Sequence, residues 1–86
     1  LKMREEFGDQ TKIATSYNNI ALVYIALKNF DIALEYLNKA LVVRVATNNK
    51  PGISIIKDNI GAIYRLMGRY DEALEQFEES LKMRLI

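Results

Sequence analysis

The sequence contains no cysteine and no histidine among its 86 residues. The absence of cysteine excludes disulfides and thiolate metal sites. Without either residue type, the usual nucleophile and base pairs of covalent catalysis cannot be assembled. The carboxylates Glu75, Glu78 and Glu79 lie at spacings typical of the solvated face of an amphipathic helix. We therefore expect no enzyme, no cofactor and no metal site.

An excess of charge of one sign and long apolar runs are also lacking. The 12 basic and 11 acidic residues are mixed along the chain and leave a net charge of +1, so no basic tract indicates nucleic-acid binding. No stretch approaches the roughly 20 apolar residues of a membrane span, and the N-terminus shows no signal peptide. The first residue is Leu1 rather than methionine. We predict a segment of a longer cytoplasmic protein that binds neither nucleic acid nor membrane.

What the sequence does contain is an internal period of 40 residues. The tetrapeptide LKMR occupies residues 1–4 and again 81–84, with LVVR at 41–44. Residues 19–44 align without a gap on residues 59–84, and the alignment contains these identities: Asn19/Asn59, Ile20/Ile60, Tyr24/Tyr64, Asp31/Asp71, Ala33/Ala73, Leu34/Leu74, Glu35/Glu75, Leu41/Leu81 and Arg44/Arg84. A fixed period in this range is the signature of a solenoid. The chain is therefore expected to hold two full periods with a short overlap.

Each period predicts two helices. In residues 11–28, apolar side chains recur at helical spacing and define one core face: Ile13, Tyr17, Ile20, Ala21, Tyr24 and Leu27. Residues 32–46 repeat the pattern with Ala33, Leu37, Ala40 and Leu41. Asn29 is expected to adopt the left-handed conformation that ends a helix, and Asp31 to cap the next helix.

The second period follows the same plan. Pro51, the one proline, belongs in a first helical turn, so we expect helices from about 52 to 67 and from about 71 onward, with a turn at residues 68–70. Residues 1–7 are expected to form the tail of a preceding helix that Gly8 closes. The predicted organisation is one segment, residues 1–86, with this tail in residues 1–8, a first repeat in 9–48 and a second repeat in 49–86.

The spacing within each helix pair resembles the tetratricopeptide repeat. The matching positions in the first copy are Tyr17, Ile20, Ala21, Tyr24, Ala33 and Leu37, and in the second copy Lys57, Ile60, Gly61, Tyr64, Ala73 and Phe77. Two features depart from the pattern: the period exceeds the usual length of about 34 residues, and Val45 replaces the final proline. The longer period is similar to that of kinesin light chains, spindle-orientation adaptors and bacterial peptide-sensing regulators. The resemblance implies an all-α, right-handed solenoid of antiparallel helix pairs.

A recurrent arginine lies on the core-facing stripe of the second helix. Arg44 follows Leu37 by seven residues and Leu41 by three, so its side chain must reach water or find an acceptor. One interpretation is a structural contact across the repeat junction, and the other is a contact with a partner. The sequence leaves the roles of Arg4, Arg44 and Arg84 open.

Opposite the core face, the first helix of each pair carries mostly apolar residues around one asparagine, where a surface helix should be polar. The candidate partner-binding residues are Thr15, Asn19, Leu22, Ala26, Ile55, Asn59, Ala62, Arg65 and Leu66. The resemblance implies that this face is the concave wall on which peptides lie. An asparagine amide both donates and accepts, so it can pair with the backbone of an extended peptide. The alternative is that packing between neighbouring first helices buries these residues.

We therefore predict a scaffold that binds a protein or peptide segment along the first helices. Two alternatives remain open: an assembly module that stacks end to end, and a regulatory domain of a larger signalling protein. Stacking is suggested by the apolar end of the chain, where no helix follows Leu81, Met83, Leu85 and Ile86.

Overall fold

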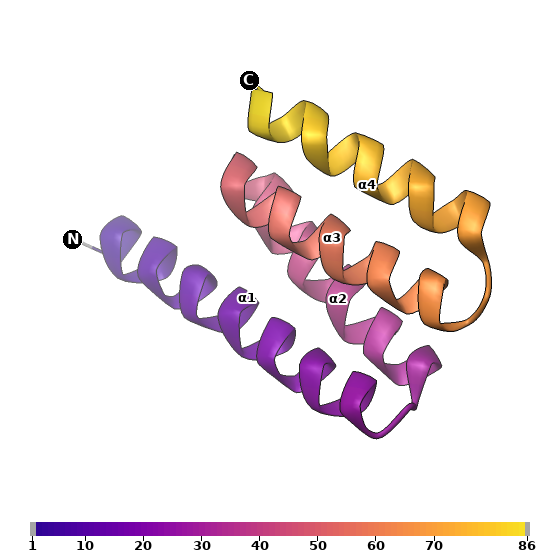
Figure 1. The fold of residues 1–86 in the computed structure, drawn as a ribbon. Coiled ribbons are helices and arrows are strands. Elements are labelled where there is room, and N and C mark those ends of the chain that lie inside the picture. Colours follow the sequence, from indigo (N-terminus) through magenta and orange to yellow (C-terminus); the bar gives the residue numbers. More distant parts are fainter. Residues whose placement is uncertain (1, 86) are drawn as a thin grey trace.

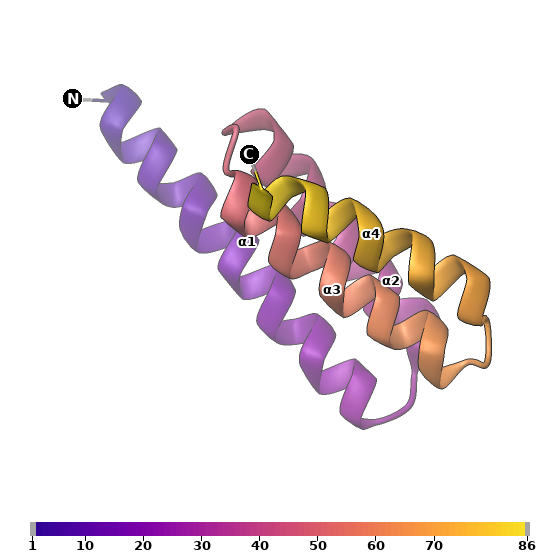
Figure 2. The same cartoon turned by 45° about the horizontal axis from the view of Figure 1, so that its top comes forward.

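A computed structural model describes residues 2–85, and the side chains of residues 9–85, as four helices. The helices are α1 (Lys2–Ala26), α2 (Phe30–Ala46), α3 (Lys50–Leu66) and α4 (Tyr70–Leu85). Consecutive helices run in opposite directions (Figure 1), and most packing lies within the hairpins α1–α2 and α3–α4, which meet through α2 and α3. The turns of both hairpins lie at the same end of the molecule in both views (Figures 1 and 2). The predicted all-α array of helix pairs is confirmed.

Three of the helices end in the same way. Lys28, Asn48 and Gly68 adopt left-handed backbone conformations, with φ values of 61°, 52° and 81°. After each of them, the next N–H donates back across the last helical turn, as from Asn29 N to Tyr24 O at 2.9 Å. This Schellman arrangement satisfies carbonyls that a helix end would otherwise leave unpaired. The left-handed residues recur at half the sequence period.

The expected roles of Asn29 and Asp31 were wrong. Lys28 rather than Asn29 is left-handed, and Asn29 is the residue that precedes α2, while Asp31 lies inside its first turn. The reason is the hydrogen bonding of the helix end: the N–H groups of Lys28 and Asn29 donate back to the carbonyls of Ile25 and Tyr24, which puts the left-handed residue at position 28. Placing a lysine in the left-handed region costs about 1–2 kcal/mol, which the core contacts must offset. Pro51, by contrast, stands in the first turn of α3 as predicted.

The expected helix end at Gly8 was also wrong, because α1 runs without interruption from Lys2 to Ala26. A glycine inside a helix costs only about 1 kcal/mol relative to alanine, so helix on both sides can continue through it. The remaining proposal for Leu1 to Arg4, a tail equivalent to the end of α2, concerns side chains outside the described residues.

The core lies where the two hairpins meet. Its buried residues are Ala21, Ala33, Leu37, Ala40, Ile56, Ile60 and Ile63, with Tyr17, Tyr24, Leu34, Leu41 and Tyr64 among the partly buried residues packed against them. Three residues predicted for the core face are instead exposed, namely Ile13 (43%), Ile20 (37%) and Leu27 (68%). Ile13 and Ile20 lie on the side of α1 that corresponds to the α3 surface packed on α2, where their equivalents Ile53 and Ile60 are buried. Leu27 follows the end of α1, and its equivalent Met67 is also exposed.

A side chain of α4 packs directly against a glycine of α3 in the second hairpin. Gly61 is buried, and a Cβ atom added to it would lie 2.8 Å from Cε1 of Phe77, closer than such atoms normally approach. The first hairpin has buried Ala21 at the equivalent place and the smaller Leu37 in place of the phenylalanine. The Phe77 ring thus occupies the space that a side chain at position 61 would need, and the size of this partner differs between the repeats. That the paired helices are closest at Ala21 and Gly61 stays a prediction.

Replacing Gly61 with leucine should destabilise the fold by about 1–3 kcal/mol, because the new side chain would overpack the contact with Phe77. Urea unfolding measures this change. Ala46→Leu, at an exposed position of α2, is the size-matched control and should leave stability nearly unchanged. Gly61→Ala should be better tolerated when Phe77→Leu is also present, since that pair reproduces the first hairpin. An unchanged midpoint for Gly61→Leu would contradict the packing described.

Candidate functional site

The predicted partner-binding residues lie outside the core on α1 and α3, and we call their face the first-helix surface. Thr15, Asn19, Leu22 and Ala26 of α1 are exposed, as are Ile55, Arg65 and Leu66 of α3, while Asn59 and Ala62 are half-buried. Its larger apolar members retain substantial exposure, at 44% for Leu22, 54% for Ile55 and 53% for Leu66. The contact between the hairpins, which runs mainly through α2 and α3, thus leaves most of the predicted residues accessible. The alternative was that helix packing buries the apolar residues while the asparagines bond locally. Within the described side chains the larger apolar residues stay exposed, whereas Asn59 does bond locally.

The two asparagines of this surface are not equivalent. Asn59 donates from Nδ2 to Oδ1 of Asn18 at 3.0 Å, which joins α3 to α1. Asn19 makes no side-chain hydrogen bond within the described part of the chain. Asn59 therefore has one structural bond and keeps its carbonyl oxygen and second N–H, while the whole Asn19 amide is accessible. Sequence comparison missed Asn18 because its counterpart in the second period is Asp58.

Arg44 occupies the junction of three helices. It extends from α2, and its Nη2 donates to Oγ1 of Thr15 on α1 at 3.1 Å. Its stem lies against Gly52 in the first turn of α3, where an added Cβ would stand 2.8 Å from Arg44 Cδ. The glycine therefore makes room for the arginine. This geometry supports the structural interpretation of Arg44 and also brings its guanidinium to Thr15, a residue of the first-helix surface.

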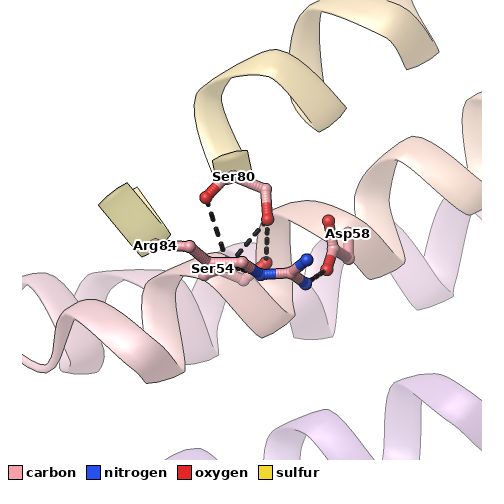
Figure 3. A network of polar contacts seen from close by, with 4 residues as sticks. All are labelled: Ser54, Asp58, Ser80 and Arg84. Carbon is pink, nitrogen blue, oxygen red and sulfur yellow. Dashed lines mark hydrogen bonds and ion pairs between the residues drawn. The ribbon is translucent and has the colours of Figure 1, made fainter. Parts of the chain in front are cut away.

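Arg84 makes a richer set of contacts inside the second hairpin (Figure 3). Its Nε donates to Oγ of Ser54 at 2.9 Å, and its Nη2 forms an ion pair with Asp58. Ser54 and Ser80 are both buried, with their hydroxyl oxygens 2.7 Å apart. The Ser80 hydroxyl also donates to the Ser54 carbonyl oxygen at 3.0 Å. The network satisfies polar groups that would be costly to bury alone.

This network has no counterpart in the first hairpin. Ala14 and Ala40 stand where the second hairpin has Ser54 and Ser80, and Asn18 stands in place of Asp58. Sequence reasoning did not find the serine pair, since serine on its own is an ordinary helix residue. The only signal was the joint change at positions 14 and 40 between periods.

A second joint change explains why Lys57 replaces the expected aromatic residue. In the first hairpin, the ammonium of Lys39 lies 5.9 Å from the ring centre of Tyr17 and 5.0 Å from that of Tyr36. In the second hairpin, Lys57 takes the place of Tyr17 and pairs with Glu79, the counterpart of Lys39, at 2.8 Å. A cation–π contact is thus exchanged for an ion pair, and the bridge between the helices is kept.

Two further surface features are shallow hollows. One shallow hollow is lined by residues 27–31 and Met67, and another by residues 68–72, so both lie at hairpin turns. The helices within residues 2–85 include none long and apolar enough to cross a membrane.

Comparisons with known proteins identify the repeat. The sequence profile described as tetratricopeptide repeat matches residues 12–85. A curated relative, the uncharacterized protein ycf37 of Guillardia theta, is 31% identical over 77 residues, which cover 90% of this chain and 40% of the relative. The chain therefore spans less than half of that relative's length. No solved structure matches the chain.

The neighbouring asparagines should respond differently to truncation. Asn18→Ala removes the acceptor for Asn59 and should cost about 0.5–1.5 kcal/mol of stability. Asn19→Ala removes no described bond and should change stability by much less. Urea unfolding of the two variants checks this difference. Equal losses would show that the bond between α1 and α3 is not what distinguishes them.

Proposed function

The chain belongs to the tetratricopeptide repeat family, and from that premise we propose that its first-helix surface binds an extended protein or peptide segment. Tetratricopeptide repeats are non-catalytic scaffolds that mediate protein–protein interactions. The observation that carries the proposal for this chain is the accessible Asn19 amide among exposed apolar residues on consecutive first helices. No catalytic role forms part of the proposal.

The binding mode follows from the chemistry of this surface. The amide of Asn19 offers a donor and an acceptor to a peptide backbone, and Asn59 retains a free carbonyl oxygen. Alternate side chains of the bound segment would pack against the apolar surface formed by Leu22, Ile55 and Leu66. Backbone bonds would therefore give general affinity, and the flanking residues would set the preference for side chains. Arg65, which is exposed beside Leu66, would favour an acidic residue in the partner.

Random peptides displayed on phage and selected on the chain provide a probe for this proposal. For a selected peptide, Asn19→Ala and Asn59→Ala together should lower affinity at least tenfold, the loss expected for about two backbone bonds. Asn19→Ala alone is the cleaner variant, because it breaks no described intramolecular bond. Asn38→Ala, at an exposed position of α2, is the matched control. Peptides that bind the double variant as tightly as the parent would contradict the proposed site.

End-to-end assembly is a second candidate, and the repeat symmetry favours it. Leu34 and Leu41 of α2 pack against the core, while their α4 equivalents Leu74 and Leu81 are 57% and 54% exposed. At the opposite end, Ile13 and Ile20 of α1 correspond to residues that α2 covers. The outer face of α4 thus carries the same two leucines that receive α3 inside the molecule. Head-to-tail contact would be heterologous and could propagate. A role as the regulatory domain of a larger protein stays a prediction.

The assembly candidate predicts that sedimentation velocity shows mass increasing with concentration. Leu74→Lys with Leu81→Lys should abolish this association, and so should Ile13→Lys with Ile20→Lys. A mixture of the two double variants should form a one-to-one dimer and nothing larger, because each keeps one complementary end. Val42→Lys, at a residue 68% exposed on α2, is the control and should associate like the parent. A monomer at every concentration would contradict the assembly role.

A further inference from the structure

The two equivalent arginines have different partners, and one of the differences is the presence of a carboxylate. Arg84 is paired with Asp58 and also donates to Ser54. Arg44 has Asn18 where Arg84 has Asp58, and it forms no ion pair within the side chains described for residues 9–85. Its described side-chain bond is to the neutral hydroxyl of Thr15. The guanidinium at this repeat position thus has a carboxylate partner in the second repeat and none among the described side chains in the first.

The side chain of Arg44 lies where a segment bound to the first-helix surface could reach it. The side chain is half-buried, with its stem against Gly52 of α3 and its terminal nitrogen on Thr15 of α1. Its head group therefore lies between the two helices that form the first-helix surface. A guanidinium has five N–H donors in a planar fork that matches a carboxylate, and one hydrogen bond to a hydroxyl leaves donors available. Partial burial strengthens such a charge-assisted bond relative to one in open water.

We propose that Arg44 is a carboxylate-binding subsite of the first-helix surface, which receives an aspartate or glutamate side chain of the bound segment. The ion pair between Arg84 and Asp58 shows, inside the same molecule, the ligand that this arginine position accepts. The inference rests on the proposed peptide-binding function and adds a specificity-determining residue to it. The partner segment is thus one with an acidic side chain placed to reach between α1 and α3.

The first test uses a small probe and needs no identified partner. The Nε–H resonances of arginine are followed by NMR while the chain is titrated with N-acetyl-glutamate amide. The Arg44 resonance should shift in a saturable way, and the Arg84 resonance should not, because Asp58 already occupies it. N-acetyl-glutamine amide is the neutral control and should have no effect. An unmoved Arg44 resonance overturns the proposal, and an equal shift with inorganic phosphate overturns its restriction to carboxylates.

Exchanging the partner residues between repeats gives a reciprocal test. Asn18→Asp should supply Arg44 with an internal carboxylate and abolish its response, while the new aspartate can still accept the bond from Asn59. Asp58→Asn should free Arg84 and make it respond to the same probe. Circular dichroism confirms that both variants keep their helical content. A response of Arg44 that survives Asn18→Asp contradicts the inference.

Peptides selected on the chain separate this inference from the proposed function. They should be enriched in one acidic position, and replacing that residue with its amide should lower affinity at least tenfold for the parent but not for Arg44→Gln. Peptides that bind in an Asn19-dependent way without acidic enrichment would leave the proposed function intact and overturn the role of Arg44. Failure to select any peptide, with a normal probe response, would count against the extended-segment proposal alone.

Discussion

The fold depends on how closely the two helices of each hairpin can approach. At Gly61 the absence of a side chain lets the Phe77 ring lie against the α3 backbone, and Ala21 with Leu37 fills the same place in the first hairpin. This short separation lets Arg44 and Arg84, on second helices, reach polar groups on the first helix of their own pair. A wider separation would remove those contacts and the core of small residues between the helices.

The two repeats keep the same contacts with different chemistry. Lys39 over Tyr17 becomes the pair of Glu79 and Lys57, and alanines at positions 14 and 40 become the hydrogen-bonded serines at 54 and 80. In each case both partners change together, because a change in one alone would leave a buried group unpaired or a gap unfilled. Asn18 is the exception: Asp58 replaces it in the second repeat, while the arginine is kept at both positions 44 and 84. That exception distinguishes the first-helix surface near α1 from its counterpart near α3.

Much of this architecture followed from the sequence, and the failures have physical causes. The period, the helix pairs and the close contact at Gly61 could be predicted because they depend on spacing and residue size. Periodicity identified Ile13, Ile20 and Leu27 as apolar, but it could not say which neighbouring element covers them. The turn at Lys28 was misplaced because the left-handed residue there is a lysine, which local preference disfavours, and its place follows from the backbone bond from Asn29 N to Tyr24 O. The different roles of Asn19 and Asn59 depend on Asn18, which only the three-dimensional contact between α1 and α3 reveals.

The connectivity of the hairpins has a consequence for how the chain opens and closes. Side-chain hydrogen bonds between helices join residues 22 to 41 positions apart, so folding requires only modest loop closure and should be rapid. The hairpins meet mainly through α2 and α3, and each therefore forms a partly independent unit that can unfold locally. A segment lying across α1 and α3 would contact both units at once. Its binding would couple their opening, so that amide exchange slows in both hairpins although the ligand touches no residue of α4.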